Sequence, residues 1–81
     1  MIKVTFYSLL RSNYRIEEEF VNSGSINDII NQIISKHPEI KPSAFRYSVV
    51  FYQGKPIHYH GFDTNIKDGE EIIFTQFVGG G

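Results

Sequence analysis

Hydrophobic and polar residues alternate at the amino end of the chain, in the stretch IKVTFYSL at residues 2–9. Ile2, Val4 and Phe6 share one parity, and the residues between them are more polar. A period of two is typical of a strand with one buried face. We therefore expect the chain to begin directly in a strand.

A second strand is indicated by YRIEEEFV, residues 14–21, which follows the polar segment 11–13. Ile16 and Phe20 are expected to share one face of it, with charged residues on the remainder. Charges are tolerated where a strand lies at the edge of a sheet. The pattern thus predicts an edge strand that pairs with the first strand as a hairpin.

The strongest periodic signal is a stripe of isoleucines in SINDIINQIISKHP, residues 25–38. Ser25 is placed to cap a helix, and Asp28 completes the pattern of a capping box. Pro38 cannot continue the helical hydrogen bonds, so the helix should end at residues 36–38. The stripe has the spacing of an amphipathic helix and consists of Ile26, Ile29, Ile30, Ile33 and Ile34.

Three further strands are predicted in the second half of the chain. A loop through Pro42 leads to a strand at residues 47–52, a turn at 53–56 and a strand at 57–60, which form a second hairpin. An Asp68-Gly69 turn then precedes a last strand at residues 71–78. The order strand, strand, helix, strand, strand, strand indicates an α+β fold, with a sheet of four to five strands and one main helix on one face.

One helix covers only one face of a sheet, so the sequence leaves open what covers the second face. The runs VVFY and EIIF place large apolar residues on both faces of strands expected to be central. An exposed apolar face usually marks a partner surface. The alternative is that loops fold over it, and the sequence does not decide between the two.

Length, charge and composition exclude several classes of function. The 81 residues suit a single domain, residues 1–81, and the formal net charge of −1 is spread along the chain without a basic cluster for nucleic acid. There is no cysteine, no stretch long enough to cross a membrane and no secretory signal pattern. We expect a cytoplasmic protein that binds neither nucleic acid nor membrane.

Weaker chemical signals have simpler structural explanations. His58 and His60 would point the same way from a strand, but two histidines are too few for a metal site. The glutamates at residues 17–19 are better explained as a solvated edge than as an acid–base pair. His37 is interpreted as a cation near the negative end of the helix dipole. The isolated glycines form no phosphate-binding loop, so we expect the chain to bind no cofactor or metal.

The whole chain resembles the small sulfur-carrier proteins of ubiquitin-like β-grasp fold. The resemblance rests on MIKVTFYSLLR, the capped isoleucine-rich helix, VVFYQGKPI and above all TNIKDGEEIIFTQFVGGG. Members of this family include the small subunit of molybdopterin synthase and the sulfur carrier of thiazole synthesis. We favour the molybdopterin type for the length of the chain and its long connection at residues 38–47. The glutamine in Thr75-Gln76-Phe77, where many molybdopterin-type proteins carry Pro-Pro, is closer to the thiazole type.

The resemblance implies that the reactive group is the carboxylate of Gly81. A ubiquitin-activating-type partner would adenylate it with ATP, and a sulfur donor protein would convert it into a thiocarboxylate. The sulfur would then pass to a cofactor precursor on the large subunit of molybdopterin synthase, or on thiazole synthase. The chain itself would not be catalytic alone, and the ATP would be bound by the partner.

Residues 77–81 are accordingly expected to be a flexible functional tail. Gly79 and Gly80 would thread a narrow tunnel, because glycine has no Cβ and lets other groups approach closely. Extended backbone from Gln76 to Gly81 reaches ~20 Å. Ordering it costs roughly 1 to 2 kcal/mol per residue, and docking through Phe74, Phe77 and Val78 would offset that cost.

Other interpretations of the glycine-rich segment stay open. In a protein modifier, the same activated carboxylate would form an isopeptide bond with a lysine of a target. In a plain interaction domain, the glycines would be an inert frayed end.

Overall fold

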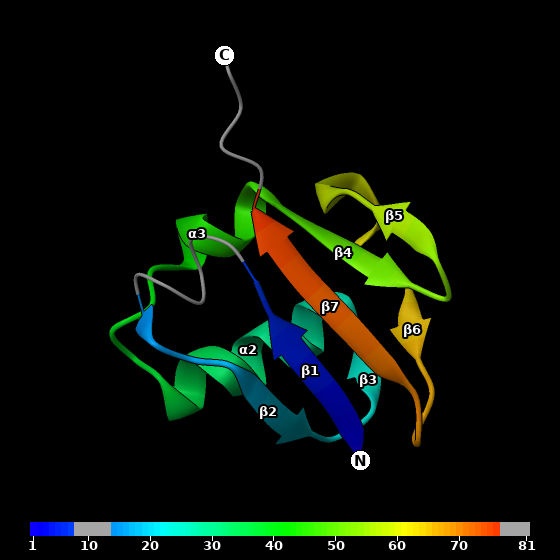
Figure 1. Ribbon diagram of the computed structural model, residues 1–81, viewed down its shortest axis with the longest axis horizontal. Coiled ribbons are helices and arrows are strands. Elements are labelled where there is room, and N and C mark those ends of the chain that lie inside the picture. Colours follow the sequence, from blue (N-terminus) through cyan, green and yellow to red (C-terminus); the bar gives the residue numbers. More distant parts are fainter. Residues whose placement is uncertain (8–13, 77–81) are drawn as a thin grey trace.

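The strands at the two ends of the described chain lie side by side in parallel, and this pairing organises the fold (Figure 1). The computed structural model describes residues 1–7 and 14–76. Its main sheet has the order β2-β1-β7-β4-β5, and every neighbouring pair except β1 and β7 is antiparallel. The strands of this sheet are β1 (Ile2–Phe6), β2 (Glu18–Val21), β4 (Ser48–Tyr52), β5 (Lys55–Ile57) and β7 (Glu71–Gln76).

Helix α2 crosses one face of this sheet (Figure 1). A two-stranded ladder, β3 with β6, joins the start of α2 to the segment before β7. A mixed five-stranded sheet with one main helix on one face is the α+β β-grasp arrangement, and it confirms the predicted fold class. The remaining elements are α2 (Ile26–Lys36), α3 (Pro42–Arg46), the 3-10 turn η1 (Tyr59–Gly61), β3 (Gly24–Ser25) and β6 (Asn65–Ile66).

The start of α2 is specified by the predicted capping box. The backbone N–H of Asp28 donates to Ser25 Oγ over 3.1 Å, and the backbone N–H of Ser25 donates to Asp28 Oδ2 over 3.1 Å. Gly24 precedes the box with φ of 155°, and a Cβ there would lie 3.0 Å from Asp28 Oδ2. Two backbone donors that have no partner inside the helix are satisfied in this way.

The isoleucine stripe of α2 packs on the inner face of the sheet, as predicted. Four of its five members are buried, and Ile34 is partly buried at the margin. Phe74 of β7 lies between two other rings: that of Phe6 stacks on it at 5.8 Å between centroids, and that of Phe45 meets it edge-on at 5.4 Å. Each isoleucine or phenylalanine removed from water contributes roughly 1.5 to 3 kcal/mol, so this layer is the main source of stability.

Strand β2 is shorter than predicted and faces the other way. Its register pairs Val21 with Ile2, which turns Val21 inward and leaves Phe20 48% exposed on the outer face. Ile16 is buried, but it precedes the strand and follows Arg15, whose φ is 57°. The expectation that Ile16 and Phe20 share a face is therefore wrong, because Ile16 lies before β2 and is not part of the alternation of that strand.

The second strand of the second hairpin begins earlier than predicted. Gln53 and Gly54 both have positive φ, 52° and 76°, as in the tight two-residue turns that join twisted strands. Pairing therefore resumes at Lys55, and Pro56 lies opposite Phe51 on edge strand β5, where a missing N–H is tolerated. The strand predicted at residues 57–60 is wrong beyond its first residue, because η1 follows.

The connection predicted as a loop contains the short helix α3. Pro42 occupies its first turn, where proline lacks only a hydrogen bond that the helix does not need. Phe45 of α3 is buried against Phe74. The connection thus closes one end of the core.

The end of the first strand differs from the prediction, whereas the predicted end of the last strand is not tested. The first strand ends at Phe6, although the N–H of Tyr7 still donates to the carbonyl of Phe74 over 2.9 Å. The last strand ends at Gln76, and the remainder of the predicted strand lies outside the described residues. Within the described ranges, no helix has both the length and the apolar character needed to cross a bilayer.

Candidate functional site

The predicted reactive segment continues from the end of β7. Five of the predicted site residues fall on it and lie outside the described residues: Phe77, Val78, Gly79, Gly80 and Gly81. The structure does place the residue before them, since Gln76 is the partner of Ser48 in the β4–β7 pairing. The segment is thus carried by a strand that is paired on both sides.

Phe74, the remaining predicted docking residue, does not belong to a surface. Its side chain is fully buried between the rings of Phe6 and Phe45. The prediction that it contacts a partner is wrong, because β7 alternates and Phe74 shares its inward parity with Ile72. Its role is to anchor β7 to the core.

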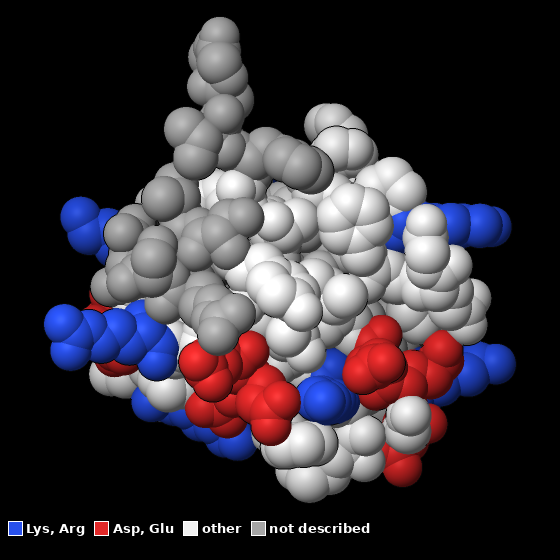
Figure 2. All heavy atoms as spheres, in the orientation of Figure 1, with Lys and Arg blue, Asp and Glu red and all other residues white. Residues whose placement is uncertain are grey.

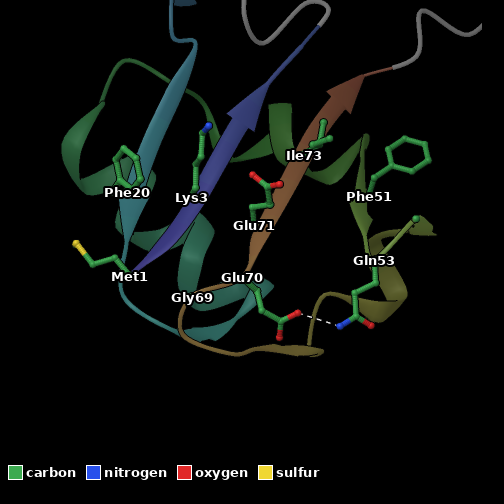
Figure 3. Close-up of a pocket in the computed structure, with 10 residues that line it drawn as sticks. Met1, Lys3, Phe20, Phe51, Gln53, Gly69, Glu70, Glu71 and Ile73 are labelled. Atoms are coloured by element: carbon green, nitrogen blue, oxygen red, sulfur yellow. Dashed lines mark hydrogen bonds between the residues drawn. The ribbon is translucent and has the colours of Figure 1, made fainter.

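The outer face of the sheet carries the apolar residues that the prediction should have named. Phe20, Phe51 and Ile73 come from three different strands and line one shallow depression of about 780 Å³ (Figure 3). Val49 lies farther along β4 and is buried. The signal was present in the uninterrupted run EIIF, in which one of two adjacent isoleucines has to face away from the helix.

Charged side chains lie along one side of this depression. Lys3 and Glu71 are neighbours across the β1–β7 pairing and lie between Phe20 and Ile73 (Figure 3). Lys3 Nζ lies 3.6 Å from the carboxylate of Glu18 on β2. Figure 2 shows acidic side chains on both sides of a basic one along the lower part of this face, below an uncharged area.

A hydrogen-bonded group of side chains fixes the far end of the depression. The hydroxyl of Tyr52 donates to Glu70 over 2.7 Å. The amide of Gln53 donates to the same carboxylate over 2.9 Å, and Figure 3 shows this second bond. These two bonds lower the pKa of Glu70 below its ordinary value, and the bond from Tyr52 has the larger effect. The pKa of the Tyr52 hydroxyl is raised, chiefly because it donates to that carboxylate. The hairpin turn is in this way tied to the start of β7.

The predicted histidine positions have different surroundings from those expected. His58 and His60 are exposed and flank the start of η1 rather than sharing a strand. His37 follows α2 as expected, but its ring also contacts Glu19, with Nε2 and Oε1 2.5 Å apart. In residues 1–7 and 14–76, no three His, Cys, Asp or Glu side chains form a group that could hold a metal ion.

The geometry of the outer face suits docking. It combines the exposed Phe20 and the partly exposed Phe51 and Ile73 with charged neighbours, on a sheet whose other face packs against α2. Ile73 and Gln76 are three residues apart on β7, about 10 Å along an extended strand. A partner in contact with Ile73 would therefore lie close to Gln76, the last residue of β7 that the structure describes.

Comparison with known proteins identifies the fold. No protein-family model matches this sequence, and no curated protein matches it either. The crystal structure of SAMP1 from Haloferax volcanii is similar, with a TM-score of 0.74 and 14% sequence identity over 99% of this chain and 98% of that chain. At this identity the likeness shows a shared β-grasp fold across the whole described architecture.

Proposed function

We propose that this β-grasp protein is a sulfur carrier whose Gly81 carboxylate is activated by a partner and converted into a thiocarboxylate. The favoured pathway is molybdopterin synthesis, in which the chain would act as the small, sulfur-donating subunit of molybdopterin synthase. The observation that carries the proposal is the direct continuation of β7 into Phe77, Val78 and three glycines. The whole-chain likeness to SAMP1 supports the fold on which the proposal depends.

The chemistry assigns a separate role to each part of the chain. A carboxylate oxygen of Gly81 attacks the α-phosphate of ATP held by the partner, and pyrophosphate leaves. A hydrosulfide sulfur from a donor protein then attacks the carbonyl carbon, and AMP leaves. Glycines at residues 79–81 allow close approach of the partner's groups because they have no Cβ. The folded domain positions the segment and binds the partner.

The outer face of the sheet is the docking surface in this proposal. Burial of Phe20, Phe51 and Ile73 against a partner would offset the cost of ordering the glycine segment. The acidic side chains of Glu18, Glu70 and Glu71 would favour an adenylating enzyme with basic residues around an apolar contact.

The direct test is the mass of the protein after incubation with an adenylating enzyme, MgATP and sulfide. The intact chain is expected to gain the mass of one oxygen replaced by sulfur. Deletion of Gly81, or Gly80→Phe, should abolish this gain without unfolding the domain, since both changes lie beyond β7. Ser35→Phe places the same bulk on an exposed position of α2 and should leave the gain unchanged.

Three outcomes would contradict parts of this proposal. Sulfur incorporation into the Gly81-deleted chain would contradict the assigned reactive group. Lysine conjugates of the intact chain in cells, without a thiocarboxylate, would indicate a protein modifier. Transfer of sulfur to thiazole synthase rather than to a pterin precursor would assign the carrier to thiazole synthesis.

A further inference from the structure

A groove separate from the depression of the outer face lies on the helix-covered side of the molecule, between α2, α3 and η1. It has a volume of about 360 Å³. We propose that it binds a peptide segment of a second protein, in which an apolar side chain and a carboxylate lie within a few residues of each other. This site requires neither activation of Gly81 nor sulfur transfer.

The floor of the groove is apolar and rigid. It is formed by Ile30 and Ile34 of α2, Phe45 of α3 and Phe62. Phe45 and Phe62 are also fully buried members of the core. These two rings hold the floor in place, and an apolar side chain entering the groove would contact chiefly the more exposed Ile34, Pro42 and Tyr59.

The rim carries the cation of Arg46 beside an aromatic ring. The guanidinium of Arg46 lies over the ring of Tyr59, 5.7 Å from its centroid, and that ring in turn meets Phe62 edge-on at 5.7 Å. Tyr59 is 50% exposed, so the stack projects from the core toward solvent. An arginine stacked on an aromatic face keeps its N–H groups free at the edge, where they match the two oxygens of a carboxylate.

The sign of the charge selects the partner. None of the described residues that line this groove is acidic, so Arg46 gives the groove a positive end. The depression of the outer face differs in that two glutamates line it, together with one lysine and the amino group of Met1. The two surfaces therefore suit different partners, and the groove favours an acidic segment.

Two amide side chains extend the recognition surface along α2. Asn27 and Asn31 are four residues apart, which places them on the same side of the helix, and both line the groove. An amide both donates and accepts hydrogen bonds, so each can pair with the backbone of an extended peptide. The combination of amides, an apolar floor and a terminal cation fits a peptide better than it fits a small ion.

The test uses the full chain and peptides displayed on phage. A library of random peptides is panned on the immobilised protein, and the enriched sequences are synthesised with a fluorescent label. We expect them to combine Leu, Ile or Phe with a nearby Asp or Glu. Arg46→Gln and Tyr59→Ser should each raise the peptide Kd by about tenfold, as expected for loss of a charged hydrogen bond. Both side chains are exposed, and circular dichroism would confirm that the variants fold.

Lys55→Gln is the matched control, because it removes an exposed cation from β5, outside the groove. Binding should be unchanged in this variant. Enrichment of peptides without carboxylates, no enrichment above an unrelated protein, or equal affinity of wild type and Arg46→Gln would overturn the proposal. Self-association that is lost in both Arg46→Gln and Phe20→Ser would instead identify a second copy of the chain, with its edge strand β2, as the occupant.

Discussion

At the scale of single residues, the contact between Glu19 and His37 joins the edge strand to the end of the helix. Glu19 Oε1 and His37 Nε2 are 2.5 Å apart, and Lys36 Nζ lies 3.5 Å from the other carboxylate oxygen. Glu39 lies 3.5 Å from the second nitrogen of His37. The hydrogen bond with His37 is the main reason why the pKa of Glu19 is lower than its ordinary value of 4.5, although burial opposes the shift.

This contact predicts a pH-dependent contribution to stability. Because the pKa of Glu19 is lower in the folded than in the unfolded chain, the contribution is complete above about pH 4.5 and is lost as the pH falls below it. Glu19→Gln should lower the free energy of unfolding by about 1 kcal/mol near pH 7 and by much less near pH 3.

Urea unfolding monitored by circular dichroism at both pH values would measure this difference. Asp63→Asn, which alters an exposed carboxylate elsewhere on the surface, is the control and should change stability little at either pH. A penalty for Glu19→Gln that stays constant with pH would contradict the explanation.

At the scale of single elements, the sequence predicted the helix more accurately than it predicted the strands. Helix α2 has its predicted start, stripe and end, because the capping box and the isoleucine spacing act within one segment. The five strands of the main sheet were predicted to exist, but β3 and β6 were not, and several boundaries and one face were wrong. Strand ends depend on register, and register is set by the neighbouring strand and the turn.

The capping box leads to a prediction for α2. Ser25→Ala should lower the free energy of unfolding by about 1 kcal/mol, because the backbone N–H of Asp28 loses its acceptor. Ser35→Ala changes the same residue type within the helix, where alanine is the better helix former, and should not destabilise. Denaturant midpoints of the two variants would measure the difference, and equal values would show that the cap contributes nothing.

At the scale of the whole molecule, adjacent side chains of β7 lie on opposite faces of the sheet. Phe74 is enclosed by the core, whereas Ile73 lines the depression of the outer face. The same strand leads into residues 77–81. The arrangement joins the interior, the proposed docking surface and the proposed reactive segment along one strand.

This arrangement predicts that two neighbouring substitutions affect different properties, one the stability of the fold and the other adenylation by the partner. Phe74→Ala should lower the free energy of unfolding by about 3 to 5 kcal/mol, because it leaves a cavity between Phe6 and Phe45. Ile73→Thr keeps a β-branched side chain and should change stability by much less, while slowing adenylation by the partner enzyme. Urea unfolding and pyrophosphate release would separate the two effects. An Ile73→Thr variant that is adenylated at the rate of wild type would remove this face from the docking surface.

The sequence by itself determined the class of fold, the position and start of the main helix and the presence of a glycine-ended segment after an apolar strand. These features depend on spacing and on contacts between residues a few positions apart. Only the tertiary structure decided that Phe74 is internal, that Phe20 is external and that Arg46 stacks on Tyr59 beside an apolar groove. Those outcomes depend on strand register and on packing between distant segments, which no local pattern specifies.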